Sequence, residues 1–303
     1  MSSVIFVMIL FFIYYLYSPV GSPKVVFLPK GSVSASITHL QNSGIKLNKI
    51  DGYILRYYGF PQYGLLDLGE ENLSRIEFLK RLAKAKAITT NITLIPGETT
   101  EIFLSQLAHE LDLDIDKLRS AYEEHAIYKE GSFVADTYNV MLGIGEEATV
   151  KYLLDISKKT MNRWAESYNI DMNSKKWLQI VTKASVIQKE ASSVSDMYFV
   201  SSVIDNRLSI GMKLQMDGSL NYGKYSHTKV TAARIRSDNS VYNTYKIAGL
   251  PPYPLCNISK DAIDAAINPK KTDYLFFVRG KNGEHIYSRY FSTHRKNIVN
   301  ATK

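Results

Sequence analysis

The chain has 303 residues, of which 45% are hydrophobic and 22% are charged. This composition excludes wholesale disorder and is sufficient for one large folded domain or two ordinary ones. The net charge of +8 predicts an anionic partner, such as an anionic membrane surface or a cell-wall polymer. The sequence has no long Lys/Arg run, zinc-ligand spacing or aromatic-glycine RNA motif, so nucleic acid is not expected as a partner. The single cysteine, Cys256, excludes an intramolecular disulfide.

An uncharged apolar run extends from Val4 to Tyr17. It is short for a membrane span, which needs about 20 apolar residues, but its terminal tyrosines suit a membrane interface. A cleaved signal peptide would require a basic leader and an A-x-A site, and neither is present. A buried core helix is the other alternative. We expect an uncleaved transmembrane anchor within residues 1–22.

The segments after this run predict short alternating strands and helices. Val25 to Ser32 is predicted to be a strand ending in a turn, with Ser32 or Ser34 capping the helix that follows. A second strand, turn and helix begin at Ile92. The stretch from Ile76 to Ala87 is an amphipathic helix with lysines on its polar face. These elements predict a small α/β domain.

The remainder of the chain mixes longer helical patterns with a hairpin. Helices are predicted over Glu146–Ala165, Lys176–Ser192, Asp196–Leu208 and Lys260–Ile267, the last capped by Ser259. A turn at Gly280–Gly283 joins two predicted strands, Tyr274–Val278 and His285–Ser288. The mixture predicts an α+β fold class.

Glu190 lies at the border of an apolar stripe on the helix predicted over Lys176–Ser192. A carboxyl group at such a border loses part of its hydration, which raises its pKa and suits a general acid. The alternative is a boundary glutamate paired with Lys183 or Lys189. The helix pattern taken alone favours the alternative.

Several short strings around and after Glu190 carry a resemblance to a known family. They are A-D-T-Y (135–138), V-I-Q-K-E-A-S (186–192), N-R-L (206–208), L-Q-M-D (214–217), Y-N-T-Y (242–245), G-L-P-P (249–252) and N-P-K-K-T-D-Y-L-F-F-V (268–278). In this order and spacing they resemble the YceG-like (MltG) endolytic murein transglycosylase family. The resemblance extends over roughly residues 25–298 and is strongest after Val186.

The resemblance implies a single-pass protein of the inner (cytoplasmic) membrane with its catalytic part on the periplasmic, cell-wall side. It implies a transmembrane anchor over 1–22, a LysM-like small α/β domain over 23–125 and a larger α+β catalytic transglycosylase domain over 126–303. Peptidoglycan glycan strands are the implied substrate, and peptidoglycan synthases are implied partners. No cofactor and no metal ion are expected.

The resemblance also implies that Glu190 is the catalytic residue. The family cuts the bond between N-acetylmuramic acid and N-acetylglucosamine without water and leaves a 1,6-anhydro end, which would terminate strand elongation. One carboxyl group can perform this reaction, because the nucleophile is a hydroxyl group of the sugar, whereas ordinary glycosidases use two carboxyl groups. Two alternatives stay open: a non-catalytic, membrane-anchored peptidoglycan-binding or scaffold protein, and a muramidase that uses water.

Further residues are predicted on the same strings. Those expected to bind substrate are Gln215, Asp217, Tyr242, Asn243 and Tyr245. The role of Asp217 is open between orienting a sugar, capping a helix and holding a turn. The alternative for the tyrosines and Asn243 is a turn with packed tyrosines. Residues interpreted as structural are Asn206, Arg207 and His285.

The chain departs from the family pattern directly after Asp217. The family usually has Pro and Thr at the next two positions, whereas this chain has Gly218 and Ser219. A glycine is expected to loosen the turn.

Overall fold

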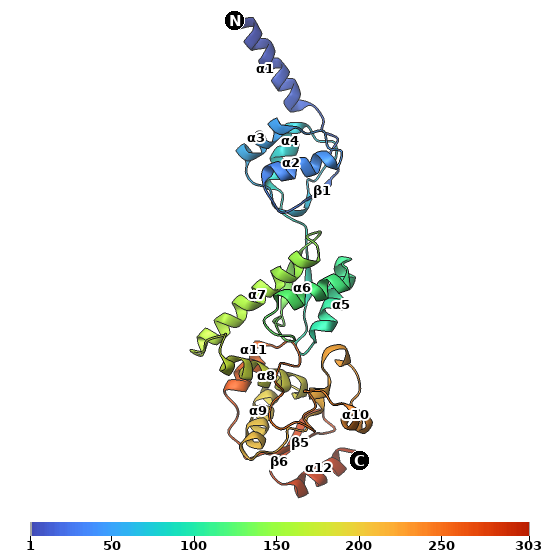
Figure 1. Cartoon of the computed structure of the whole chain (residues 1–303), viewed down its shortest axis with the longest axis vertical. Helices are drawn as coiled ribbons and strands as arrows, with labels where there is room; N and C mark the ends of the chain where they lie inside the picture. The colour runs from blue at the N-terminus through green and yellow to red at the C-terminus, as the bar shows by residue number, and fades with distance from the viewer. Residues whose placement is uncertain (1, 303) are drawn as a thin grey trace. The chain divides into compact units, whose positions relative to one another are not determined.

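The computed structural model describes residues 2–302 and divides into two compact units, each with its own core (Figure 1). Unit 1 comprises the chain up to Ile92 together with Asn139–Thr149, and unit 2 comprises Thr93–Tyr138 and the chain from Val150 onward. The chain passes between the units within three elements: β3 (Thr89–Thr93), β4 (Thr137–Met141), which pairs with β3, and α7 (Glu146–Ser167).

Unit 1 packs short helices against a two-stranded antiparallel sheet. Its further elements are α1 (Ser2–Tyr17), β1 (Val25–Leu28), α2 (Val33–Asn42), α3 (Lys49–Tyr58), β2 (Gly64–Asp67) and α4 (Arg75–Lys84). Ser32 caps α2 by accepting a hydrogen bond from the Ala35 N–H, which confirms the predicted strand, turn and capped helix. The core is mainly aliphatic, with residues such as Leu55 and Leu82, and it also contains the aromatic ring of Phe78.

Asp51 is buried in unit 1 and binds three groups. Its carboxylate accepts hydrogen bonds from the Arg75 guanidinium at 2.7 Å, the Tyr15 hydroxyl at 2.7 Å and the Asn48 N–H at 2.6 Å. The Arg75 guanidinium also lies over the Tyr15 ring, 4.0 Å from its centroid. This network joins the end of α1 to α3 and α4.

Replacing this buried carboxylate is expected to destabilise unit 1. Asp51→Asn would leave the buried Arg75 guanidinium without a counter-ion, at a cost of about 3 kcal/mol in the free energy of unfolding measured in urea. The control is Glu70→Gln, because Glu70 is exposed and lies 3.4 Å from Arg81. This variant is expected to change the free energy of unfolding by less than about 1 kcal/mol. Equal losses in the two variants would contradict the assignment.

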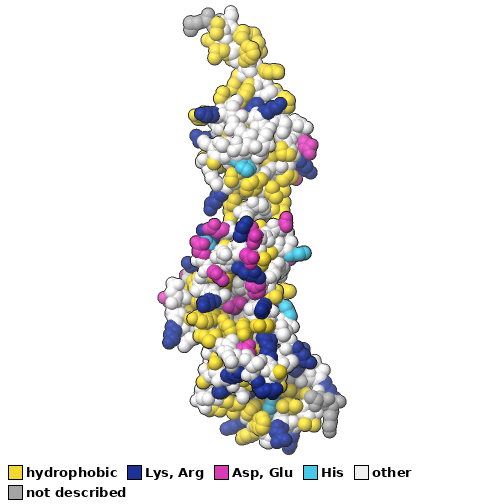
Figure 2. All heavy atoms as spheres, turned by 45° about the vertical axis from the view of Figure 1, so that its right-hand side comes forward, with side chains coloured by type: hydrophobic (Ala, Val, Ile, Leu, Met, Phe, Trp, Pro, Cys, Tyr) yellow, Lys and Arg dark blue, Asp and Glu magenta, His cyan; other side chains and the backbone are white. Residues whose placement is uncertain are grey.

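The structure corrects the prediction of a transmembrane anchor. Helix α1 has 16 residues, so at 1.5 Å per residue it spans roughly 24 Å, less than the ~30 Å of a bilayer core. Its hydrophobic side chains are exposed (Figure 2). Among residues 2–302, no helix combines the length and the apolar character needed to cross a membrane. The transmembrane anchor expected within residues 1–22, and the single-pass inner-membrane localisation that depended on it, were therefore wrong.

Unit 2 is mainly helical. Its elements are α5 (Thr100–Leu111), α6 (Ile115–His125), most of α7, α8 (Lys175–Glu190), α9 (Val194–Ser209), the 3-10 helices η1 (Asp217–Leu220) and η2 (Gly223–Tyr225), α10 (Ala232–Ser237), α11 (Lys260–Ile267), β5 (Phe276–Arg279), β6 (His285–Ser288) and α12 (Phe291–Thr302). Helices α8, α9 and α11 pack against one another around Trp177, Val203 and Ile263 (Figure 1).

Two sequence predictions for unit 2 are confirmed. Ser259 caps α11 by accepting a hydrogen bond from the Ala262 N–H. Strands β5 and β6 form the predicted antiparallel hairpin, with Arg279 opposite His285. In this register the imidazole of His285 and the hydroxyl of Tyr287 both contact Asp196 in the first turn of α9.

Helix α8 ends two residues earlier than its apolar pattern predicts. Ala191 is its extended C-terminal cap, and the Ser193 side chain accepts a hydrogen bond from the Asp196 N–H as the cap of α9. The residues before α9 therefore form its N-terminal cap, although the apolar pattern of α8 continues into them. Glu190 is consequently the last residue of α8, next to a chain reversal, instead of lying within the helix.

Candidate active site

The carboxyl group of Glu190 is held by a backbone donor from η1. The Gly218 N–H donates a hydrogen bond to Glu190 Oε1 at 2.6 Å. A Cβ atom added to Gly218 would lie 2.8 Å from Glu190 Oε1, 2.8 Å from Lys189 Cβ and 3.0 Å from the Lys189 carbonyl oxygen. Only a glycine allows η1 to approach α8 this closely without a shift, so Gly218 fixes the turn.

The surroundings of Glu190 favour its protonated form. The pKa of its carboxyl group is raised to about 7, mainly by desolvation and also by the charge of Asp217, whereas the Gly218 hydrogen bond and the charges of His285 and Arg207 oppose the shift. The position at the carboxyl end of α8 acts in the same direction as desolvation, because that end of a helix disfavours a negative charge. The residue is half-buried and can still exchange a proton.

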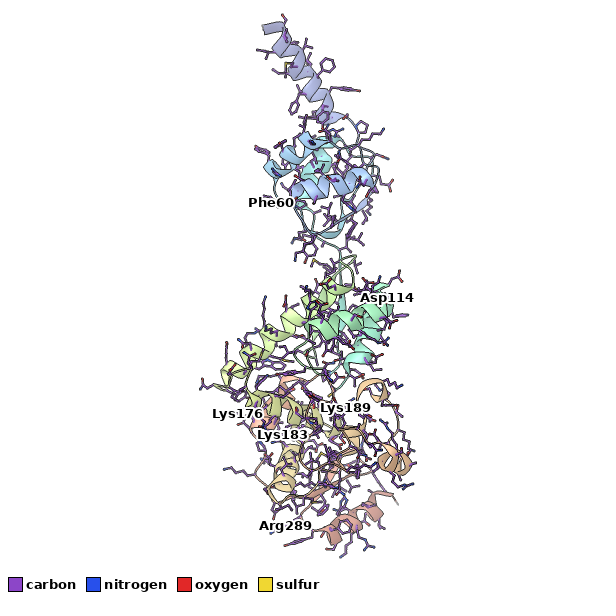
Figure 3. All side chains as sticks on the ribbon, viewed as in Figure 1. Phe60, Asp114, Lys176, Lys183, Lys189 and Arg289 are labelled. Carbon is purple, nitrogen blue, oxygen red and sulfur yellow. The ribbon has the colours of Figure 1, made fainter. Side chains whose placement is uncertain are left out.

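Both lysines that could have paired with Glu190 have other partners. Lys183 binds the Asp205 carboxylate at 2.6 Å and donates a hydrogen bond to the Ala266 carbonyl at 3.0 Å. Lys189 donates to the Ser226 hydroxyl at 2.8 Å. Figure 3 shows both lysines on α8. These contacts disfavour the interpretation of Glu190 as a boundary glutamate in an ordinary ion pair.

A second carboxylate, Asp196, organises the side of the site formed by α9 and the hairpin. Its oxygens accept hydrogen bonds from His285 Nδ1 at 2.8 Å, the Tyr287 hydroxyl at 2.5 Å and the Ser192 N–H at 2.8 Å. Desolvation alone would raise the pKa of Asp196, but these donors outweigh it and lower the pKa to about 2. Asp196 is therefore ionised at neutral pH and orients His285, whose charge acts on Glu190.

Arg207 is a buried cation that also acts on Glu190. Its guanidinium donates to the backbone carbonyls of Leu275 and Leu214, which join the hairpin and the start of the η1 loop to α9. Burial lowers the pKa of Arg207, and the charge of Glu190 opposes that shift. These contacts agree with the interpretation of Arg207 as a structural residue. Its positive charge also lowers the pKa of Glu190.

The segment before η1 is fixed to the Y-N-T-Y loop. The Gln215 N–H donates to the Thr244 carbonyl at 3.1 Å, and the Met216 N–H donates to the Thr244 hydroxyl at 3.0 Å. Gln215 is exposed and has a φ of 49°, in the left-handed region that non-glycine residues rarely adopt. The Asp217 carboxylate accepts a hydrogen bond from the Tyr245 hydroxyl at 2.6 Å. Asp217 and Tyr245 thus lie near enough to Glu190 for their charges to interact with it, whereas Gln215 is attached to the Y-N-T-Y loop through its backbone.

Tyr242 and Asn243 have different environments. Tyr242 is half-buried, with its ring centroid 4.7 Å from that of Tyr222, and desolvation raises its pKa to about 12. Asn243 is buried, and its amide nitrogen donates to the carbonyls of Ile235 and Asp238 at 2.9 and 2.8 Å. The amide of Asn243 therefore braces the loop, whereas Tyr242 lies at its edge. Substrate contact by either residue stays a prediction.

Glu130 is a second buried glutamate in unit 2. Its Oε1 accepts hydrogen bonds from the Thr100 N–H at 2.8 Å, the Thr100 hydroxyl at 2.6 Å and the Gly131 N–H at 3.0 Å. Desolvation nevertheless raises its pKa to about 7, although these donors and the charge of Lys189 oppose the shift. The sequence gives no indication that Glu130 is buried, because a glutamate in a loop is not part of a periodic apolar pattern.

No metal-binding arrangement accompanies these acids. Within residues 2–302, no group of three or more His, Cys, Asp or Glu side chains is placed to hold a metal ion. Glu190 offers the site a carboxyl group with a pKa of about 7, beside the charged and hydroxyl groups described above.

Crowding at Gly218 gives a direct test of the site geometry. Gly218→Ala is expected to displace either η1 or the Glu190 carboxyl group, reducing stability by about 1–3 kcal/mol and any Glu190-dependent activity by about tenfold. Thermal unfolding and activity assays measure the two effects. Gly211→Ala is the control for a lost glycine, since a Cβ there meets no atom within 4 Å, although its φ of 69° also adds strain. Full activity in Gly218→Ala would contradict the close approach.

The comparisons with known proteins agree on one family. A model described as the YceG-like family matches residues 29–300. The chain is 35% identical over 140 residues to an endolytic murein transglycosylase of Bacillus subtilis (strain 168), covering 46% of this chain and 39% of that protein. It is 29% identical over 208 residues to an endolytic murein transglycosylase of Streptococcus pneumoniae serotype 2 (strain D39 / NCTC 7466), covering 66% and 37%. The chain thus spans about two fifths of the length of these relatives.

A solved structure is similar in fold. The crystal structure of a YceG-like protein from Listeria monocytogenes matches with a TM-score of 0.59 and 22% identity, covering 90% of this chain and 98% of that one. At this identity the likeness shows the fold alone. Because the family model extends over nearly the whole chain, including Glu190 and every element around it, the chain belongs to the YceG-like family.

Proposed function

We propose that this chain is an endolytic lytic transglycosylase of peptidoglycan. The observation that carries the proposal is the carboxyl group of Glu190, fixed by the Gly218 N–H and surrounded so that its pKa is about 7. A carboxyl group that is protonated near neutral pH can act as a general acid. The names of the similar proteins, endolytic murein transglycosylases, support the same reaction class.

The proposed reaction needs one proton and no water. Protonated Glu190 donates its proton to the glycosidic oxygen while the bond from C1 of N-acetylmuramic acid to that oxygen breaks, through an oxocarbenium-like state. The 6-hydroxyl oxygen of the same muramyl residue then bonds to C1 and returns its proton to Glu190. The products are a 1,6-anhydro-muramyl end and a free hydroxyl on the N-acetylglucosamine, and the enzyme is regenerated.

The groups around Glu190 have distinct roles in this proposal. Gly218 holds Oε1, which leaves Oε2 to carry the proton. His285 and Arg207 limit the rise of the pKa, so that Glu190 can also serve as the base after the bond breaks. Gln215, Asp217 and Tyr245 are proposed to contact the sugar beside the scissile bond, and Tyr242 to contact a neighbouring sugar. Asn243 is proposed to act on the substrate only by shaping the loop.

The proposal has a consequence for strand synthesis. A cut within a nascent glycan strand would end its elongation, so peptidoglycan synthases are the partners that the proposal predicts. The LysM-like domain expected over residues 23–125 stays a prediction, and the proposed reaction does not depend on it.

Product analysis tests the proposal. Purified protein is incubated with sacculi and with uncrosslinked glycan strands, and the products are analysed by mass spectrometry for anhydro-muramyl ends. We expect such ends with the wild type and their loss in Glu190→Gln. Incorporation of labelled oxygen from water would instead identify a muramidase. Binding of peptidoglycan without any cleavage would identify a non-catalytic wall-binding protein.

A further inference from the structure

Unit 2 contains a hollow of about 450 Å³ beside the Y-N-T-Y loop. Its lining includes two aromatic rings and several polar side chains: Tyr222, Tyr225, Arg234, Asp238, Asn239 and Ser240. This volume and this combination of aromatic surface with a few convergent polar groups are typical of small-ligand sites.

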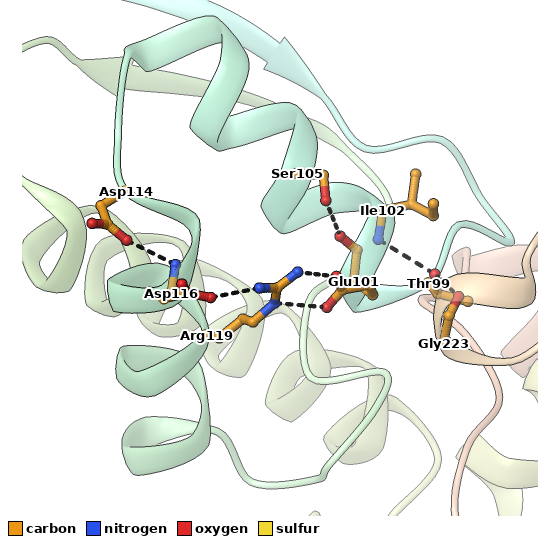
Figure 4. A network of polar contacts seen from close by, with 8 residues as sticks. All are labelled: Thr99, Glu101, Ile102, Ser105, Asp114, Asp116, Arg119 and Gly223. Carbon is orange, nitrogen blue, oxygen red and sulfur yellow. Dashed lines mark hydrogen bonds and ion pairs between the residues drawn. The ribbon is translucent and has the colours of Figure 1, made fainter.

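The aromatic wall of the hollow is fixed in place. The Tyr222 and Tyr225 rings meet edge to face with centroids 5.6 Å apart, and the Tyr222 ring also packs on Tyr242. The Thr99 hydroxyl donates to the Gly223 carbonyl at 2.8 Å, which attaches η2 to the start of α5 (Figure 4). Rings held in this way lose little conformational freedom when a ligand binds.

Arg234 provides an unused donor at the hollow. Its guanidinium lies 4.4 Å from the Tyr225 ring centroid, and its Nη2 donates to the Leu220 carbonyl. Its Nη1 is buried and has no hydrogen-bond partner among the described residues. Because buried polar groups in native proteins are normally paired, Nη1 is left for a ligand acceptor that it meets once the Arg234 side chain, which lines the hollow, shifts towards the ligand on binding.

Asp238 provides the complementary acceptor. Its Oδ2 accepts a hydrogen bond from the Tyr222 hydroxyl at 3.0 Å, and its Oδ1 accepts from the Ser240 N–H at 2.8 Å. A carboxylate has about four acceptor sites, so Asp238 can accept further hydrogen bonds from ligand hydroxyls. The hollow thus offers a donor, an acceptor and aromatic surface.

The hollow is connected to Glu190 through η1. Leu220, which binds Arg234, is two residues after Gly218, which binds Glu190. Tyr242 links the Tyr222 ring to the loop whose Tyr245 binds Asp217. One short 3-10 helix and one loop therefore support both sites.

We propose that this hollow is a saccharide subsite that binds an N-acetylamino sugar of the glycan strand away from the scissile bond. The sugar ring packs on Tyr222 and Tyr225, an acceptor oxygen of its substituents binds Arg234 Nη1, and its hydroxyls donate to Asp238. The proposal deepens the proposed function and takes the identity of the glycan from it.

Glycan binding, measured separately from cleavage, tests the subsite. Fluorescently labelled, uncrosslinked glycan strands are titrated with the full chain carrying Glu190→Gln, which prevents turnover. Arg234→Lys keeps the charge and a donor for Leu220 but removes the second nitrogen. We expect about five- to tenfold weaker binding of long strands, corresponding to the loss of one hydrogen bond while the positive charge is kept, and no change for oligosaccharides too short to reach the hollow.

Two further variants make the result decisive. Arg236→Lys is the matched control, because Arg236 lies on the same short helix, is exposed and does not line the hollow. Tyr225→Leu removes one ring independently of Arg234 and is expected to weaken binding of long strands by a similar factor. Circular dichroism verifies that each variant is folded.

The outcomes separate the subsite from the proposed reaction. Binding by Arg234→Lys and Tyr225→Leu within about twofold of the control would overturn the subsite, as would an absence of binding by the parent protein. Cleavage by the otherwise wild-type chain, with normal anhydro ends, would leave the proposed reaction intact in that case. A failure to form anhydro ends would count against the reaction, while the binding comparison would still decide the subsite.

Discussion

Glu190→Gln is expected to lower the rate of glycan cleavage by about 10³-fold, with little change in glycan binding. General acid–base groups typically contribute 10²–10⁴-fold, and this carboxyl group acts in both halves of the proposed reaction. Glutamine has nearly the same shape and can still accept the hydrogen bond from the Gly218 N–H. The variant therefore removes the transferable proton but keeps the shape of the side chain and its hydrogen bond with the Gly218 N–H.

The pH dependence of cleavage provides an independent readout of the same proton. Because Glu190 must be protonated when the reaction begins, kcat/KM is expected to be flat below its pKa of about 7 and to fall tenfold per pH unit above it. Glu166→Gln is the control, since Glu166 is exposed on α7, and it should leave both the rate and the profile unchanged. A Glu190→Gln variant with wild-type rate, or a profile rising through pH 7, would contradict the assignment.

The sequence predicted the partial desolvation of Glu190 and most of the helices that surround it, because these features are local, whereas its catalytic role is implied by the family resemblance and stays a prediction. The border of an apolar stripe shows where a carboxyl group will be partly desolvated, and capping serines such as Ser259 mark where helices begin. The end of α8 was not predictable in the same way. Two caps, Ala191 and Ser193, interrupt a pattern that continues to Ser192, and their effect depends on α9 packing against α8.

The groups that shift the pKa of Glu190 were harder to predict, because their position depends on tertiary structure. The donor from Gly218 is a backbone N–H, which every residue except proline carries, so it has no signature in the sequence. The glycine at a position where the family usually has proline predicts a looser turn, whereas the structure shows a turn that is tightly fixed against α8. His285 reaches Asp196 across 89 positions of the chain, through the β5–β6 register.

The predicted membrane anchor failed for a different reason. The prediction of an anchor at Val4 to Tyr17 rests on composition, which does not show where the helix ends. In the structure the helix stops at Tyr17, and Val20 is buried in the core of unit 1. Tyr15, which was expected at a membrane interface, donates instead to the buried Asp51. The apolar run therefore forms one short helix whose end is attached to unit 1.

The two buried glutamates of unit 2 are expected to make its stability depend strongly on pH. The pKa values of Glu130 and Glu190 rise from 4.5 to about 7 on folding, so folding is favoured most below pH 4.5, where both are protonated in either state. This contribution is lost as the pH rises from 4.5 through 7. At 1.36 kcal/mol per pH unit, each group costs the folded state up to roughly 3 kcal/mol at pH 8, and the pair up to roughly 6 kcal/mol.

The variants Glu130→Gln, Glu190→Gln and their combination separate this effect from the titration of other groups. We expect the difference in unfolding free energy between variant and wild type, measured in urea, to grow from pH 4 to pH 8 in favour of the variant. Asp196 provides the opposite sign, because its lowered pKa adds stability above pH 3.8 that is lost as the pH falls towards 2. A difference that stays constant across this range for Glu190→Gln would show that its proton is not retained near neutral pH. The proton that Glu190 retains in the folded state is the same proton that the proposed reaction transfers. The pH dependence of the unfolding free energy therefore tests, without any substrate, whether Glu190 holds that proton near neutral pH.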